Sequence, residues 1–192
     1  MLLDLMTVTT PVDFGSVFGR SCPVEVELGC GNGRFLLEYG SAHPELALLG
    51  VERARVYGER GAARARRLGV ANIRVVVTTA EEVLFRWLVP DSIQGVHVYF
   101  PDPWPKRRHH KRRILNSSVV ARIAEVLTPG GLVRVKTDHP GAASWISGVL
   151  AQERRLEPVD EDEAFSGLPV TNFETRYGGV NGVIRFAHRR RE

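Results

Sequence analysis

A glycine-rich loop between a strand-like run and a helix-like run restricts the fold of this chain more than any other feature. Residues 24–28 read as a buried strand, and Gly29, Gly31 and Gly33 follow it directly. A helix-forming segment, 34–39, begins after the last of these glycines. Glycines allow a tight turn and a close approach to a ligand, so this order is typical of a nucleotide-binding sheet. A simple strand-to-helix turn is the structural alternative.

The alternation of strand-like and helix-like segments continues along the chain. Further strands are predicted over 46–51, 73–77, 96–100, 132–136 and 182–187, and further helices over 54–68, 81–88, 114–127 and 141–152. The alternation predicts an α/β fold with a mostly parallel, doubly wound sheet covered by helices on both faces. Residues 153–171 break this rhythm with acids and two prolines, so we expect a long connection with room for one strand.

Length and composition fit one domain over residues 1–192, in which a short N-terminal segment, 1–23, precedes the first strand. No apolar run reaches membrane-spanning length, and no signal-like segment opens the chain. The two cysteines, Cys22 and Cys30, lack metal-binding spacing, so we expect reduced thiols, no metal and a cytoplasmic location. A monomer and a homodimer are both compatible with the sequence.

The net charge is only +4, but the basic residues are clustered in three segments, 53–67, 106–113 and 185–191. Six of the eight residues from Lys106 to Arg113 are Lys or Arg, and the other two are histidines. Such clustering favours an acidic macromolecular partner. Histidines and a nearby tryptophan among the cations favour RNA, because stacking and phosphate contacts combine there. A solvated basic surface is the alternative.

Two glutamates indicate which nucleotide the glycine loop binds. Glu27 lies two residues before Gly29, where a carboxylate would repel a pyrophosphate but suit a positively charged ligand. Glu52 ends the second strand, where an acid can hold ribose hydroxyls. S-adenosylmethionine carries a sulfonium and an amino group, so it fits these acids better than a nicotinamide dinucleotide does.

A proline-caged acid follows the fourth predicted strand. Asp102 lies between Pro101 and Pro103, which restrict its backbone, and Trp104 adds a flat surface for stacking. In a doubly wound fold this loop faces the reactive end of the cofactor, so Asp102 is our candidate catalytic residue. A stiff connector with a core tryptophan is the alternative.

Together, VEVELGCGNG, GVERA, VYFPDPWPKRRHHKRRI, LTPGGLVRVKTDH and TNFETRY resemble the motifs of the bacterial tRNA (guanine-N7)-methyltransferase family, in that family's order. The resemblance implies a Rossmann-like class I methyltransferase fold with an antiparallel last strand. It also implies methyl transfer from S-adenosylmethionine to N7 of guanine 46, in the variable loop of tRNA.

The resemblance assigns a role to each matching residue. Cofactor contacts fall on Glu27, Gly29, Gly31, Gly33, Glu52, Thr79 and Asp102, and Asp102 is also catalytic. Substrate contacts fall on Lys106, Asp138, Thr171, Asn172, Phe173 and Glu174. RNA contacts fall on Arg108, His109, His110, Lys111, Arg112 and Arg113. Thr79 stands where the family usually has Asp or Asn, so adenine recognition here has a hydroxyl without a carboxylate's charge.

Three other functions are compatible with parts of this pattern. A methyltransferase acting on an exocyclic amine often carries an Asn/Asp-Pro-Pro-aromatic loop, which Pro101 to Trp104 reorder. A non-catalytic RNA-binding module would bind adenosylmethionine weakly, against which the intact Glu27 and Glu52 argue. A dehydrogenase would bind a nicotinamide cofactor.

Overall fold

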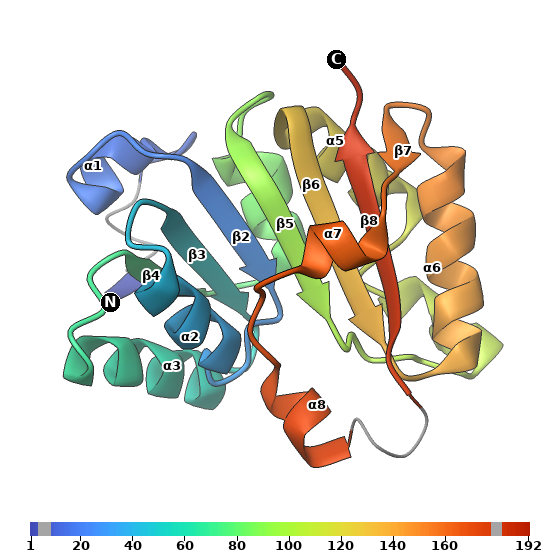
Figure 1. Cartoon of the computed structure of the whole chain (residues 1–192), viewed down its shortest axis with the longest axis horizontal. Helices are drawn as coiled ribbons and strands as arrows, with labels where there is room; N and C mark the ends of the chain where they lie inside the picture. Colours follow the sequence, from blue (N-terminus) through green and yellow to red (C-terminus); the bar gives the residue numbers. More distant parts are fainter. Residues whose placement is uncertain (4–8, 178–181) are drawn as a thin grey trace.

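The computed structural model describes residues 1–3, 9–177 and 182–192, apart from the side chains of residues 107, 172, 176 and 177 (Figure 1). A central sheet has the strand order β1-β4-β3-β2-β5-β6-β8-β7. Its strands are β1 (Leu2–Leu3), β2 (Val24–Leu28), β3 (Ala47–Glu52), β4 (Ile73–Val77), β5 (Ile93–Tyr99), β6 (Leu127–Thr137), β7 (Leu156–Pro158) and β8 (Ile184–Arg190). Among the described strands, β8 pairs antiparallel with both β6 and β7, and the other pairs are parallel. The predicted mostly parallel sheet with an antiparallel last strand is confirmed.

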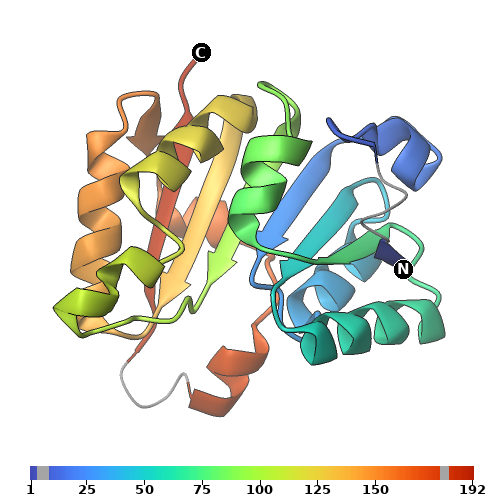
Figure 2. The same cartoon turned by 180° about the vertical axis from the view of Figure 1, so that it is seen from behind.

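Two groups of helices cover the two faces of the sheet (Figures 1 and 2). One face carries α2 (Arg34–Ala42), α3 (Arg55–Arg67) and α7 (Glu161–Phe165), and the other carries α4 (Ala80–Glu82), the π-helical turn η1 (Val83–Trp87), α5 (Ser117–Val126) and α6 (Pro140–Gln152). The remaining helical segments are α1 (Phe14–Phe18), the 3₁₀ turn η2 (Arg107–Arg112) and α8 (Asn172–Tyr177).

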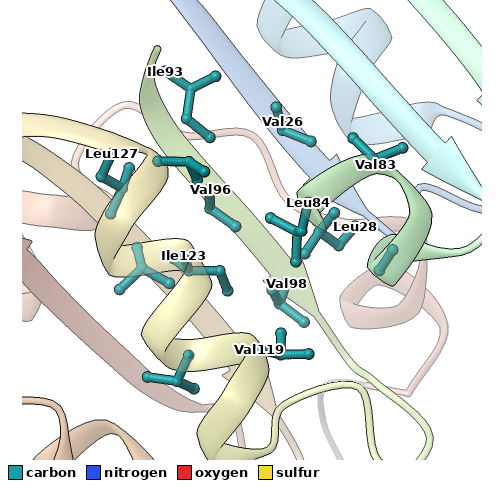
Figure 3. Packing of buried hydrophobic residues seen from close by; sticks show 14 of the residues in the cluster. Val26, Leu28, Val83, Leu84, Ile93, Val96, Val98, Val119, Ile123 and Leu127 are labelled. Atoms are coloured by element: carbon teal, nitrogen blue, oxygen red, sulfur yellow. The ribbon is translucent and has the colours of Figure 1, made fainter. Parts of the chain in front are cut away.

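Residues of the central strands alternate between the two faces. Val26 and Leu28 of β2 and Val96 and Val98 of β5 belong to the larger apolar core, with η1 and α5 packed over them (Figure 3). The intervening residues point to the opposite face, because successive side chains of a strand alternate. On β2 those residues are Glu25 and Glu27, and both are buried. The strand at the centre of the sheet therefore presents two acids to one face.

The order of the strands places a ligand site between β2 and β5. The chain runs outward from β2 through β3 to β4, then returns to form β5 beside β2 and continues to β6 on the other side. Ligands of open α/β sheets bind at such a reversal, beyond the carboxyl ends of the strands. In Figure 1 the arrowheads of β2, β5 and β6 point toward the same edge, near α8.

Several element boundaries differ from the sequence-based expectation. The helix predicted from residue 114 begins at Ser117, because Asn116 caps it by accepting a hydrogen bond from the Val119 N–H at 3.0 Å. The strand predicted over 132–136 extends over Leu127–Thr137, and a register shift opposite Ile93 and Gly95 accommodates its proline and glycines. The last strand, predicted over 182–187, is Ile184–Arg190.

Two segments contain more structure than predicted. The connection over 153–171 holds the expected strand, β7, and also the helix α7. Asp160 caps α7 by accepting a hydrogen bond from the Glu163 N–H at 2.8 Å, and three acids occupy its first turn, where the helix dipole favours them. The N-terminal segment contributes β1, which pairs with β4 at the edge of the sheet.

Candidate active site

Two adjoining pockets, of about 350 and 460 Å³, lie at the carboxyl ends of β2, β3 and β5. Gly29, Gly31, Tyr57, Tyr99 and Phe100 line both pockets. The first pocket adds Glu27, Thr171 and Phe173 from the predicted residues. The second, larger pocket adds Glu52, Thr79, Asp102 and Arg112. Predicted cofactor, catalytic and substrate residues, separated by up to 146 positions between Glu27 and Phe173, therefore meet in one cleft.

The glycine loop makes the turn that its sequence predicts. Gly29, Gly31 and Gly33 have φ values of +82°, +53° and +71°, a region that favours glycine. Gly33 is the N-cap residue of α2, and a Cβ atom at this position would lie 3.3 Å from the Gly61 Cα atom of α3. The absence of side chains thus permits both the turn and the close packing of two helices beneath the cleft.

The carboxyl group of Glu27 is buried without a protein partner for one of its oxygens. Its Oε2 atom forms no hydrogen bond within the described ranges, and the residue is 5% exposed. Burial, and then the nearby carboxylate of Glu52, raise the pKa of Glu27 to about 8. A buried polar atom without a partner is costly, so this position suits a ligand that brings a positive hydrogen-bond donor. The amino group of S-adenosylmethionine is such a donor.

Glu52 and Thr79 occupy the second pocket, and both also stabilise the local backbone. The Glu52 carboxylate accepts hydrogen bonds from the Gly31 N–H at 2.9 Å and the Ala54 N–H at 2.7 Å. A carboxylate has about four acceptor positions, so two remain for ribose hydroxyls. Thr79 caps α4 by accepting a hydrogen bond from the Glu82 N–H at 3.2 Å, which leaves its hydroxyl proton available as a donor.

The loop that holds Asp102 has strained backbone angles at both ends and is held in place by Arg113. Phe100 and Trp104 have φ values of +50° and +40°, uncommon for residues with large side chains. Arg113 donates hydrogen bonds to the carbonyl oxygens of Pro103 at 3.1 Å and Trp104 at 3.4 Å. Its guanidinium also lies 5.1 Å from the centre of the Trp145 ring. The exposed side chain of Asp102 is consequently presented to the second pocket on a fixed backbone.

The basic run divides into outward-facing residues and one inward-facing residue. Lys106, Arg108, Lys111 and Arg112 are exposed, and the Arg112 guanidinium lies 5.0 Å from the centre of the Trp104 ring. His109 and His110 are half-buried, His109 against Trp104 and His110 against Trp145. The sequence predicts an RNA contact for Arg113 too, but the structure places its guanidinium inside the protein. Its hydrogen bonds and its burial, at 9% exposure, explain this placement.

Thr171 and Glu174 form a reciprocal cap at the start of α8. Glu174 accepts a hydrogen bond from the Thr171 N–H at 2.7 Å, and the Thr171 hydroxyl accepts one from the Glu174 N–H at 3.2 Å. The buried Lys136 ammonium pairs with the same carboxylate at 3.0 Å. This arrangement packs Phe173 against Phe100, with ring centres 4.5 Å apart. The side chain of Asn172 lies outside the described residues.

Asp138 and Lys106 lie outside the lining of both pockets. Asp138 follows the last residue of β6, at the edge where the cleft opens, and is half-buried. Lys106 is exposed at the start of η2. Their contacts with the substrate stay predictions.

A buried polar network behind the first pocket is absent from the sequence-based expectation. His97 bonds Glu25 through Nε2 at 2.6 Å and the Tyr99 hydroxyl through Nδ1 at 2.7 Å. Burial lowers the pKa of His97 despite the nearby Glu25, which favours the neutral ring. Its Nε2–H then donates to Glu25, and Nδ1 accepts from Tyr99. The network fixes Tyr99, a wall of both pockets, and the alternation of His97 and Tyr99 along β5 is the signal that could have revealed it.

Known proteins resemble this chain over most of its length. The profile of a family described as a putative methyltransferase matches residues 21–182. A tRNA (guanine-N(7)-)-methyltransferase of Mycobacterium avium is 43% identical over 181 residues, covering 91% of this chain and 68% of the relative. The chain belongs to the tRNA (guanine-N7)-methyltransferase family. This membership confirms the predicted family and decides against a dehydrogenase.

Other relatives of the tRNA (guanine-N7)-methyltransferase family show the same extent of similarity. One from Mycobacterium tuberculosis strain H37Rv is 40% identical over 174 residues, covering 88% of this chain and 65% of the relative. The chain thus spans about two thirds of the length of these relatives. Within the described ranges, no helix is long and apolar enough to span a bilayer. No three His, Cys, Asp or Glu side chains gather there in an arrangement that could hold a metal.

Solved structures share the fold at low sequence identity. The 16S rRNA methyltransferase KamB superposes with a TM-score of 0.63 and 16% identity, covering 93% of each chain. The aminoglycoside resistance methyltransferase NpmB1 gives a TM-score of 0.60 and 17% identity, covering 92% of this chain and 91% of that one. These similarities establish the class I methyltransferase fold that the sequence predicts.

Proposed function

We propose that this protein transfers a methyl group from S-adenosylmethionine to N7 of a guanine in tRNA, and that the guanine is residue 46 of the variable loop. The observation that carries the proposal is the pair of pockets that join Glu27 to Asp102 through shared walls. One pocket offers a buried carboxylate to a cationic ligand, and the other presents a rigidly held acid. The identity to tRNA (guanine-N(7)-)-methyltransferases supports the choice of substrate.

Cofactor binding rests on four features of the cleft. S-adenosylmethionine supplies, when bound, a methyl group made electrophilic by its sulfonium. Glu27 binds the amino group of the cofactor, and the backbone of Gly29 and Gly31 permits its close approach. Glu52 accepts the ribose hydroxyls, and Thr79 donates a hydrogen bond to the adenine.

Reaction at N7 of guanine demands alignment and charge stabilisation from the protein. N7 has a free lone pair and carries no proton at neutral pH, so no base is required to remove one. The purine becomes positively charged as the new bond forms, and a fixed carboxylate stabilises that charge. Asp102 has this role, because the braced loop holds it in the second pocket. Glu174 holds Thr171 and Phe173 at the first pocket, and Asp138 contacts the substrate from the rim.

The exposed and half-buried residues of the basic run bind the tRNA backbone. The set comprises Lys106, Arg108, His109, His110, Lys111 and Arg112. Because these residues lie beside Asp102, they would hold a backbone phosphate of the tRNA close to the guanine that reacts. The two free thiols and a tRNA substrate favour action in the cytoplasm.

The experiment is methylation of unmodified tRNA with labelled S-adenosylmethionine, followed by mapping of the product through N7-specific chain cleavage. We expect one cleavage site, at guanine 46. A label on an exocyclic amine, a different guanine, or no product refutes the proposal. Asp102→Asn separates binding from reaction: cofactor affinity should be kept and turnover lost. Full turnover in this variant would exclude the role of the carboxylate.

A further inference from the structure

A stripe of arginines runs along α3 away from the cleft. Tyr57, Arg60, Arg64 and Arg67 follow one another at spacings of three, four and three, which place them on one side of α3, and Arg53 lies just before the helix begins. We call these five residues the α3 stripe. Arg53, Tyr57, Arg60 and Arg67 are exposed, and Arg64 is half-buried with a hydrogen bond to the Asn32 carbonyl at 3.3 Å. From end to end the stripe is about 20 Å long.

The charge of the α3 stripe is not neutralised by the protein. The single acid of α3, Glu59, pairs with Arg55, which lies off the stripe, at 2.6 Å. Arg53, Arg60 and Arg67 form no ion pair with any described residue. Like charges three or four residues apart destabilise a helix, and the stripe contains two such pairs, Arg60–Arg64 and Arg64–Arg67. The helix dipole favours Arg64 and Arg67 in the last turn of α3, but it does not favour Arg53 or Arg60, whose charges suit the binding of an anion.

The α3 stripe begins inside the cleft. Arg53 and Tyr57 line the second pocket on one side, and Trp104 and Arg112 line it on the other. Figure 2 shows α3 and the lime segment that contains η2 on opposite sides of the carboxyl edge of the sheet. Tyr57 is 51% exposed, so an aromatic ring lies open at the mouth of the pocket.

A base that enters such a cleft brings its two flanking phosphates to opposite rims. The basic run of η2 supplies cations on one rim, and the α3 stripe supplies them on the other. We infer that the α3 stripe is a second tRNA-binding surface, which contacts the backbone on the side of the target guanine away from η2. Tyr57 stacks on a base or ribose at the rim. The inference rests on the proposed function, because it takes tRNA as the ligand.

The test compares two double variants of the full chain with equal loss of charge. Arg60→Ala with Arg67→Ala removes two cations of the stripe. Arg66→Ala with Arg154→Ala is the control, since both residues are exposed, Arg66 on α3 outside the stripe and Arg154 beyond the end of α6. Binding of unmodified tRNA is measured as a function of salt concentration, and cofactor affinity and thermal unfolding are measured beside it.

We expect the stripe variant to bind tRNA about tenfold more weakly at moderate salt and to reduce the slope of log K against log[salt] by about two. Cofactor affinity and unfolding temperature should match those of the control. Equal tRNA affinities and equal slopes in the two double variants overturn the inference. Methylation by the unaltered protein is assayed in parallel: without N7 product the proposed function fails, while the comparison of slopes still reports on the surface.

Discussion

Glu27 should release a proton when the cofactor binds at neutral pH. Its carboxyl group is buried, lacks a partner for Oε2 in the described structure, and has a pKa raised to about 8. At pH 7 about nine molecules in ten therefore hold this proton before binding. An ammonium group of the ligand pairs with the ionised carboxylate and not with the protonated carboxyl group. Glu27 must therefore lose its proton when the ligand binds.

The number of protons released or taken up follows from the titrations of Glu27 and of the amino group of the ligand. The α-amino group of a ligand such as S-adenosylmethionine has a reference pKa of about 7.8, and binding requires its protonated form. At pH 7 the complex should release about 0.8 proton net, because Glu27 loses about 0.9 and the amine gains about 0.1. At pH 9 the carboxyl group is already ionised and most of the amine is neutral, so binding should take up about 0.8 proton. Affinity should accordingly peak near pH 8.

Calorimetric titration with S-adenosylmethionine in buffers of different ionisation enthalpy measures the proton count directly. Glu27→Gln is the matched control, since it keeps the shape of the side chain and removes the titration. This variant should bind more weakly, release no proton at pH 7, and still take up a proton at pH 9. A wild-type count near zero at pH 7 would show that Glu27 is ionised before binding or does not meet the amine.

Three further predictions concern the residues that support the cleft. Arg113→Lys keeps the charge but loses the planar contact with the Pro103 and Trp104 carbonyls. In this variant turnover should fall about tenfold, and the slope of log K for tRNA binding against log[salt] should not change. Arg113→Gln, which removes the charge, should also leave that slope unchanged, and a decrease by one in this variant would instead place Arg113 on a phosphate. Glu174→Gln leaves the buried Lys136 ammonium without its counter-charge, so denaturant titration should show a loss of about 3 kcal/mol. Gly33→Ala adds a Cβ atom at φ +71° and against Gly61; we expect about 1–2 kcal/mol less stability in the same titration, and weaker cofactor binding.

The sequence predicts well those parts of the fold that depend on local pattern. Alternation and glycine spacing alone predict the strand at 24–28 and the glycine loop after it, and the structure places them as predicted. Boundaries were less accurate where a cap decides them, as at Asn116. The strand β6 extends through Pro129 and Gly130 because a register shift absorbs them, and no local pattern reveals that shift.

The candidate functional residues also divide into those whose role a local pattern predicts and those whose role depends on tertiary packing. The pair Thr171 and Glu174 has the spacing of a capping box, so its structural role was accessible from the sequence. Arg113 is different. Within a run of cations nothing distinguishes it from Arg112, and its inward direction depends on Trp145, which lies 32 positions later and offers its ring to the guanidinium. Only tertiary packing separates a phosphate-binding cation from one that braces the loop of Asp102.

Of the two acids of β2, one has a structural role and the other a ligand-binding role. Glu25 and Glu27 lie on the same face of one strand and are equally buried, at 5% exposure each. Although burial opposes it, His97 and Arg134 lower the pKa of Glu25, whereas burial and Glu52 raise that of Glu27. The protein therefore supplies the partners of one acid and leaves the other to a ligand. Loss of the Glu25 carboxylate should destabilise the fold, while loss of the Glu27 carboxyl group should cost the fold little, because Oε2 has no partner among the described residues, and should weaken cofactor binding.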